Sequence, residues 1–221
     1  MDRIMHQIFL LNRHMLFFMK ENILPISILV TPLTIYFVFK KSRRMTSLDH
    51  LPRRFKSFEF KGIVTKVGDG DGFKVVHMPL LRFKSSIKGI EPLSIRLAGI
   101  DAPEVRFFDR PEQPFAKEAR EELRRLVLNK KVKIRVLDID HYRRIVAMVF
   151  VRKNTFQNLN VNLEMVKKGL ACVYDSAKTS FGGLKSRFIE EEKRAQKKKL
   201  GIWSDPSFIL PREFKEKHRM R

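Results

Sequence analysis

Residues 60–78 read FKGIVTKVGDGDGFKVVHM, two β-rich runs separated by an acidic glycine stretch. Valine, isoleucine and phenylalanine favour strands, and a short Gly-Asp connection between two such runs is a strong hairpin signal. A type I′ turn is the ordinary explanation for residues 68–73, GDGDGF. The same residues also place Asp69 and Asp71 beside flexible glycines, where a bulky anion can approach the backbone.

Two well-known ligand-binding loops do not match this stretch. An EF-hand calcium loop needs an oxygen ligand at its fifth position and glutamate at its twelfth, where this chain has Phe73 and Leu80. The dinucleotide fingerprint G-x-G-x-x-G needs glycine in place of Phe73 and a helix after it, whereas a strand pattern follows. The stretch is therefore interpreted as an acidic hairpin.

A second segment, RLAGIDAPE at residues 96–104, combines a strand with charged groups at its exit. The strand carries Arg96 and ends at Asp101, Pro103 stops the ladder, and Glu104 follows on the loop. Two carboxylates and an arginine around a forced strand exit favour a site. A charged strand edge with an ordinary turn also fits this segment taken alone.

A third charged cluster is DHYRR, residues 140–144. Arg143 and Arg144 stand where another strand begins. An arginine pair by itself usually just faces solvent.

Hydrophobic patterning predicts five strands and three helices beyond residue 58. The strands are expected at 60–67, 72–78, 93–100, 131–139 and 144–151, and the helices at 114–129, 160–169 and 184–201. The fifth strand is apolar on both alternations, as expected for a barrel wall with helices packed outside. Asn160 and Gly169 are a suitable N-cap and stop for the second helix. The pattern indicates a small β-barrel with helices, without choosing among such folds.

The composition favours a polyanionic partner. Lys and Arg number 46 against 24 Asp and Glu, which gives a net charge of +22. Such an excess points to nucleic acid or an anionic membrane surface, although a merely solvated basic surface would have the same composition. Cys172 is the only cysteine, which excludes an internal disulfide and a cysteine-rich zinc site.

The N-terminal part differs from the rest. Residues 23–39 carry no charge, and Pro25 and Pro32 suit a membrane helix better than the interior of a buried soluble helix, which is the alternative. The following residues, KKSRRM, are basic and offer no small-residue cleavage site, which disfavours a signal peptide. The expected organisation is an N-terminal segment at 1–22, a transmembrane helix at 23–39 and a basic linker at 40–57.

The order of these motifs resembles the staphylococcal nuclease (thermonuclease-like) domain. That family has a DGD hairpin, an R-L-x-x-x-D-x-P-E segment, a D-x-Y-x-R turn and a C-terminal helix ending near IWS. This chain has them at residues 69–71, 96–104, 140–144 and 202–204. It resembles in particular the fungal single-pass membrane proteins called probable endonucleases, which share VGDGD (67–71), His-x-Pro (77–79) and P-x-Q-P-[FY] (111–115). The domain is expected at 58–205, followed by a basic tail at 206–221.

The resemblance implies an α+β fold, an OB-type five-stranded barrel with three helices, and calcium-dependent hydrolysis of phosphodiesters. It implies that Asp71 and Asp101 ligate the metal and that Arg96, Glu104 and Arg144 are catalytic. Three positions depart from the bacterial enzyme: Gly72 and Ala102 replace threonines, and Arg143 replaces a glycine. These departures concern metal affinity and substrate fit rather than the type of reaction.

The chain is accordingly expected to be a membrane-anchored endonuclease acting on DNA, RNA or both with little sequence specificity, in the mitochondrial membrane by family resemblance. The alternative is a catalytically inactive, membrane-tethered nucleic-acid-binding module. In that case Phe83, Phe107 or Phe108 would serve as stacking platforms.

Overall fold

The computed structural model describes residues 43–79, 87, 89–106, 111–155, 157–177 and 179–218. The expected transmembrane helix at 23–39 and the aromatic residues Phe83, Phe107 and Phe108 lie outside the described residues. Within the ranges given above, no helix is both long and apolar enough to cross a membrane. Arg44–Arg221 forms one compact unit.

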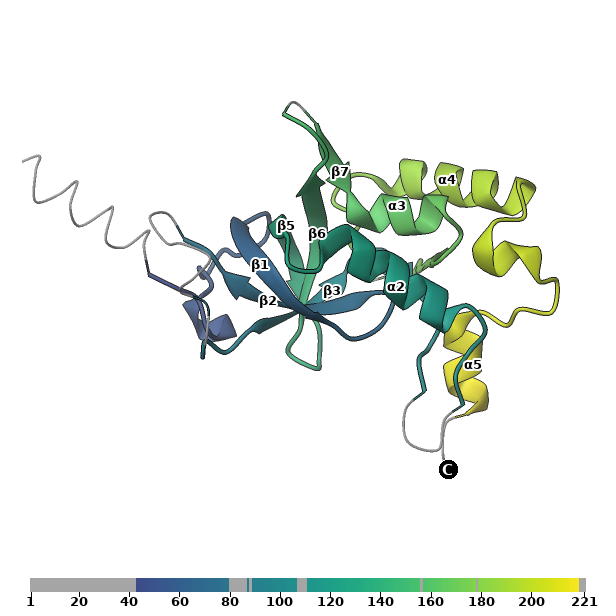
Figure 1. The fold of residues 1–221 in the computed structure, drawn as a ribbon, viewed down its shortest axis with the longest axis horizontal. Helices are drawn as coiled ribbons and strands as arrows, with labels where there is room; N and C mark the ends of the chain where they lie inside the picture. The colour runs from purple at the N-terminus through teal and green to yellow at the C-terminus, as the bar shows by residue number, and fades with distance from the viewer. Residues whose placement is uncertain are drawn as a thin grey trace, which may run out of the picture. The chain divides into compact units, whose positions relative to one another are not determined.

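Five strands close into a barrel (Figure 1). They are β1 (Glu59–Val67), β2 (Gly72–His77), β3 (Leu93–Leu97), β5 (Lys131–Ile139) and β6 (Ile145–Arg152). The antiparallel order is β3-β2-β1-β5-β6, and a parallel pairing of β3 with β6 closes the ring. Closure leaves these strands without a free edge. The five predicted strands and the barrel are therefore confirmed, except that the third strand ends at Leu97 rather than at residue 100, because the chain reverses at Gly99.

Three short strands lie outside the ring. Strand β7 (Asn158–Asn160) extends the sheet beyond β6. Strand β4 (Ile100–Asp101) pairs with β8 (Cys172–Val173) in a separate two-stranded sheet.

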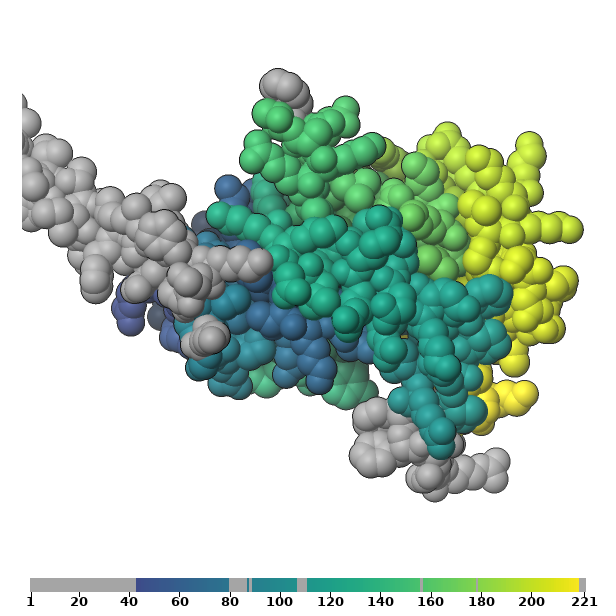
Figure 2. Space-filling view, in the orientation of Figure 1, coloured from purple at the N-terminus to yellow at the C-terminus, as the bar shows by residue number. Residues whose placement is uncertain are grey.

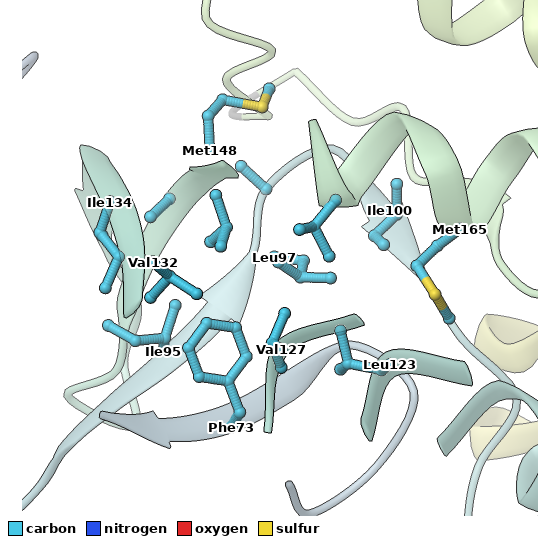
Figure 3. Close-up of a cluster of buried hydrophobic side chains, with 14 of the residues drawn as sticks. Phe73, Ile95, Leu97, Ile100, Leu123, Val127, Val132, Ile134, Met148 and Met165 are labelled. Carbon is cyan, nitrogen blue, oxygen red and sulfur yellow. The ribbon is translucent and has the colours of Figure 1, made fainter. Parts of the chain in front are cut away.

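The barrel interior is filled by side chains from every wall. Figure 3 shows the side chains of Phe73 from β2, Ile95 from β3, and Val132 and Ile134 from β5 meeting in this core. Ile95 and Ile134 are almost fully buried, and burying a side chain of this size stabilises a fold by roughly 1.5–3 kcal/mol. The interior is thus a packed core rather than a ligand cavity.

Three helices cover the barrel where the sequence predicts them: α2 (Ala116–Val127), α3 (Val161–Lys167) and α4 (Lys185–Lys197). Helix α2 buries Leu123 and Val127 on the face expected from its spacing. The predicted cap of α3 is confirmed, because the Asn160 side chain accepts a hydrogen bond from the N–H of Leu163 at 3.1 Å. Helix α3 packs against both β6 and α4.

The GDGD connection is not a type I′ turn. Residues 68–71 form a four-residue loop in which the N–H of Gly68 donates to the carbonyl of Gly72, and none of them has a positive φ. Gly70 is needed for space rather than for its dihedral angles. A Cβ atom there would lie 2.6 Å from Cβ of Ala102 and 2.8 Å from Cβ of Ala119. The missing side chain lets the loop pack closely against α2 and the segment that follows β4.

The folded unit extends beyond residues 58–205 on both sides. In the segment expected as a linker, Met45 is buried in the core, its N–H donates to Nδ1 of His77 at 3.0 Å, and a short 3₁₀ helix, η1 (Leu48–His50), follows. In the segment expected as a tail, helix α5 (Pro211–Lys217) buries Phe214. Between α4 and α5, the 3₁₀ helix η3 (Gly201–Ser204) contains the IWS motif and buries Ile202.

Candidate active site

The β2–β3 pairing brings the two acidic motifs together. Gly72 and Arg96 are cross-strand partners, and the N–H of Leu97 donates to the carbonyl of Asp71 at 2.8 Å. Asp71, which immediately precedes β2, therefore lies directly beside Arg96. A guanidinium nitrogen, Nη2 of Arg96, lies 3.1 Å from Oδ2 of Asp71.

Asp101 reaches the same arginine by a sharp reversal of the chain after β3. Gly99 has φ +76°, a left-handed conformation that glycine adopts without strain, and a Cβ there would lie 2.8 Å from the ring of Phe181. Pairing with Cys172 then fixes Asp101 in β4. Nη2 of Arg96 donates to Oδ1 of Asp101 at 2.8 Å, so both buried carboxylates share one guanidinium nitrogen.

Glu104 is held by its backbone against the segment that leads into α2. Its N–H donates to Oε1 of Gln113 at 3.0 Å, and its carbonyl accepts from the N–H of Gln113 at 2.9 Å. Gln113 is buried, and its Nε2 also donates to the carbonyl of Ile209. The loop bearing Glu104 is therefore tied to the C-terminal segment.

Lys215 of α5 is a member of this cluster that the sequence did not predict. Its Nζ lies 3.0 and 3.2 Å from the two carboxylate oxygens of Asp101 and 2.9 Å from Oε1 of Glu104. The surrounding residues 206–221 are rich in charge and carry no motif. The position of Lys215 beside Asp101 and Glu104 is therefore evident only from the fold.

Arg144 stands apart from the direct contacts. Nε of Arg144 pairs with Oδ2 of Asp140 at 2.7 Å, and its N–H donates to Oδ1 of the same residue. Its guanidinium carbon lies 5.4 Å from the centre of the exposed Tyr142 ring. The preceding Arg143 has φ +59°, a left-handed conformation at the position where the bacterial enzyme has glycine.

Burial makes the two aspartates costly to ionise without cations nearby. It raises the pKa of Asp71 to about 7, with Asp69 adding to the rise and with Arg96, Lys215 and Arg144 opposing it. Burial, followed by the charge of Asp71, also raises the pKa of Asp101. Arg144 is thus within electrostatic range of Asp71 although the two do not form an ion pair. The site thus contains two buried aspartates whose ionised forms need a nearby positive charge.

The donor set fits a hard divalent cation. Carboxylate oxygens are the ligands that calcium prefers, and two of them reach a single nitrogen atom of Arg96, so one ion could bridge the same pair. Among the residues that the structure describes, no group of three or more His, Cys, Asp or Glu side chains is arranged to hold a metal. An ion here would complete its shell with backbone carbonyl, water or substrate oxygens.

A closed five-stranded barrel with acidic and basic groups gathered at one site defines a class: an OB-type α+β domain with a site for a cation and an anionic substrate. The family model described as "Staphylococcal nuclease homologue" matches residues 94–205. The chain belongs to this family, as its motifs predicted, and nucleases of the family typically depend on a metal ion.

Curated fungal relatives carry the name "Probable endonuclease LCL3". The protein of Komagataella phaffii is 37% identical over 191 residues, covering 80% of this chain and 83% of the relative. That of Pyricularia oryzae is 36% identical over 215 residues, covering 90% and 83%. That of Verticillium alfalfae is 42% identical over 178 residues, covering 74% and 61%.

Proposed function

We propose that this chain is a calcium-dependent endonuclease that hydrolyses phosphodiester bonds in DNA, RNA or both. The observation that carries the proposal is the sharing of Arg96 by the buried carboxylates of Asp71 and Asp101, with Glu104 joined to Asp101 through Lys215. Family membership and the names of the fungal relatives support the same reaction.

Asp71 and Asp101 would hold the calcium ion, with the backbone carbonyl of Ala102 as a further ligand. When bound, the ion supplies positive charge to the phosphate and stabilises the charge that develops on its oxygens. The two carboxylates are already adjacent and buried, so sharing an ion requires movement of the cationic side chains that now contact them rather than of the carboxylates themselves.

Glu104 would orient or deprotonate the attacking water, since a carboxylate in hydrogen-bond reach of the water can accept its proton. Arg96 and Arg144 would bind phosphate oxygens through their planar guanidinium groups. Arg96 has a second task, because its contacts hold Asp71 and Asp101 together. Stabilisation of charge by pre-placed groups of this kind is usually the largest single contribution to such catalysis.

Nucleic acid would be bound mainly through its backbone. The net charge of +22 favours sequence-independent phosphate contacts. Tyr142 adds an exposed ring on the same turn as Arg144, and bases stack on such rings with little regard to sequence. Both features fit a protein that binds nucleic acid in general rather than a particular base sequence.

The direct test incubates the purified protein with end-labelled DNA and RNA in calcium and then in excess chelator. Internal cleavage that requires the metal supports the proposal. Tight binding without cleavage in calcium, magnesium or manganese would instead favour the inactive nucleic-acid-binding module.

We further propose a single membrane-spanning segment at residues 23–39, in the mitochondrial membrane. The support is the uncharged run itself and the basic residues that follow it at 40–44. The full-length protein is expected to stay in the membrane pellet after alkaline carbonate extraction of mitochondria. Its release would contradict a spanning segment.

A further inference from the structure

Helix α5 places a lysine on two of the carboxylates that the proposed reaction uses. Nζ of Lys215 faces both oxygens of Asp101, at 3.0 and 3.2 Å, and Oε1 of Glu104 at 2.9 Å. Asp101 is almost fully buried and the lysine side chain is about one-third exposed. The ammonium therefore lies at the mouth of the acidic cluster.

The contact rests on a fixed C-terminal segment rather than on a loose tail. Phe214, next to Lys215, is buried, and Pro211 begins the helix at a position where its missing N–H has no cost. Just before α5, the carbonyl of Ile209 accepts a hydrogen bond from Nε2 of Gln113, the residue that also holds the backbone of Glu104. In the space-filling view, the yellow C-terminal segment lies against the teal segment before α2 (Figure 2).

An ammonium in this position is incompatible with a calcium ion bound through both oxygens of Asp101. Calcium binds carboxylate oxygens at about 2.3–2.6 Å, so an ion on the open side of Asp101 would occupy nearly the same place as Nζ. Even a neighbouring placement leaves a divalent and a monovalent cation a few ångströms apart, where their repulsion amounts to several kcal/mol at an effective dielectric constant of about 20. The two cations must therefore exclude each other or one must move.

We propose that Lys215 is an internal cation that competes with the divalent metal for Asp101 and Glu104, so that metal binding displaces its ammonium from the site. The inference rests on the proposed nuclease function, since it assigns a regulator to the same carboxylates. Helix α5 is then a C-terminal element that sets the metal concentration at which the site fills. Coupling between two binding events is reciprocal. Any interaction that stabilises α5 with Lys215 on the carboxylates therefore also weakens binding of the metal.

The test is a calorimetric calcium titration of the purified protein without substrate. Lys215→Met keeps the apolar stem and removes the charge, and it is expected to tighten the apparent Kd for calcium at least about tenfold, within the usual range of coupling between sites. The matched control is Lys217→Met, which removes the same charge from an exposed position on the same helix. It should change the Kd by less than about twofold, because exposed charges are screened by salt.

Lys215→Arg retains the competing charge and should bind calcium no more tightly than the parent. A Kd for Lys215→Met equal to or weaker than that of the parent overturns the proposal, as does an equal gain in Lys217→Met. Absence of calcium binding in both the parent and Lys215→Met also overturns it. If calcium binds as expected but no nucleic acid is cut, the nuclease proposal fails while the competition stands.

A melting experiment provides a readout that a merely structural lysine would not change. Without calcium, Lys215→Met leaves the carboxylates of Asp101 and Glu104 with one cation fewer, so its Tm should fall below that of the parent. Saturating calcium should restore most of the loss, giving a larger calcium-induced rise in Tm than in the parent. An equal loss of Tm with and without calcium would indicate packing alone and contradict the proposal.

Discussion

Asp71 and Arg96 are joined by an ion pair of 3.1 Å because their strands are held in register by the Gly72–Arg96 pairing. A slip of one residue would turn Arg96 to the opposite face of β3 and separate it from Asp71. The site is thus a consequence of the barrel's hydrogen-bonding register. Mutations in the site and in the barrel are expected to have different effects.

Asp71→Asn and Asp101→Asn are each expected to weaken calcium binding by at least about tenfold while leaving the barrel folded. Each change removes one negative charge from the proposed ligand set and keeps the size of the side chain. Calcium titration monitored by calorimetry provides the measurement, and circular dichroism checks the fold. Asp205 is partly exposed and its carboxylate accepts hydrogen bonds from Ser207, so it is a suitable control position, and Asp205→Asn should leave the calcium Kd unchanged.

Substitutions of the two adjacent arginines at the β5–β6 turn should differ in their effect on the cleavage rate. Arg144→Ala is expected to lower the cleavage rate by about 10³–10⁵-fold, the usual range for an arginine that faces a transferring phosphoryl group. Arg143→Gly should preserve the rate and raise the free energy of unfolding by up to about 1 kcal/mol, because φ +59° favours glycine. Similar rates for the two variants would remove Arg144 from the proposed mechanism.

The attachment of Met45 to the barrel should weaken in acid. Burial, with the nearby charge of Arg44 adding to it, lowers the pKa of His77 to about 4. The folded state then binds a proton less readily than the unfolded state between pH 6.5 and 4. The stability that neutral His77 contributes is therefore complete above pH 6.5 and is lost as the pH falls towards 4, with a total of about 3 kcal/mol.

Urea denaturation of the parent and of His77→Gln across this pH range checks the expectation. Glutamine offers an acceptor for the Met45 N–H but does not titrate. The unfolding free energy of the parent minus that of His77→Gln should therefore decrease as the pH falls from 6.5 to 4. A difference that is independent of pH would show that His77 does not titrate in the expected way.

Binding of single-stranded nucleic acid by the metal-free protein should weaken steeply with salt and vary little with sequence. Logarithmic plots of affinity against salt concentration are expected to be linear with a negative slope, as counterions are released from phosphates. Tyr142→Ala should reduce affinity by about 1–3 kcal/mol at every salt concentration, the usual contribution of one stacked base. Fluorescence anisotropy measures both, and a flat salt response would contradict backbone binding.

The strands and most of the site could be predicted from the sequence because their signals are local. Alternating apolar residues mark the barrel strands, and the short acidic and basic motifs contain Asp71 just before β2, Arg96 within β3, and Asp101 and Glu104 in and after β4. The position of each of these side chains thus follows from the strand that it lies in or next to.

Lys215 and Gln113 could not be predicted in the same way. Helix α5 has only seven residues, too few for a clear helical period, and its many charges resemble a solvated tail. Gln113 stood within the recognised stretch 111–115, but its role depends on Ile209, which is distant in sequence. The attachment of Met45 to His77 is likewise a contact between segments that no local pattern records.

The most direct test of the central claim is the single-turnover cleavage rate of Glu104→Gln in saturating calcium, measured beside the parent and beside Glu121→Gln. Glu121 lies exposed on α2 and serves as the matched control for loss of a carboxylate. If Glu104 handles the attacking water, Glu104→Gln should cut at least about 10²-fold more slowly than the parent, the usual contribution of a general base. It should retain its circular dichroism spectrum and its affinity for nucleic acid, and Glu121→Gln should cut at the parent rate. A folded Glu104→Gln protein that cuts as fast as the parent would contradict the account.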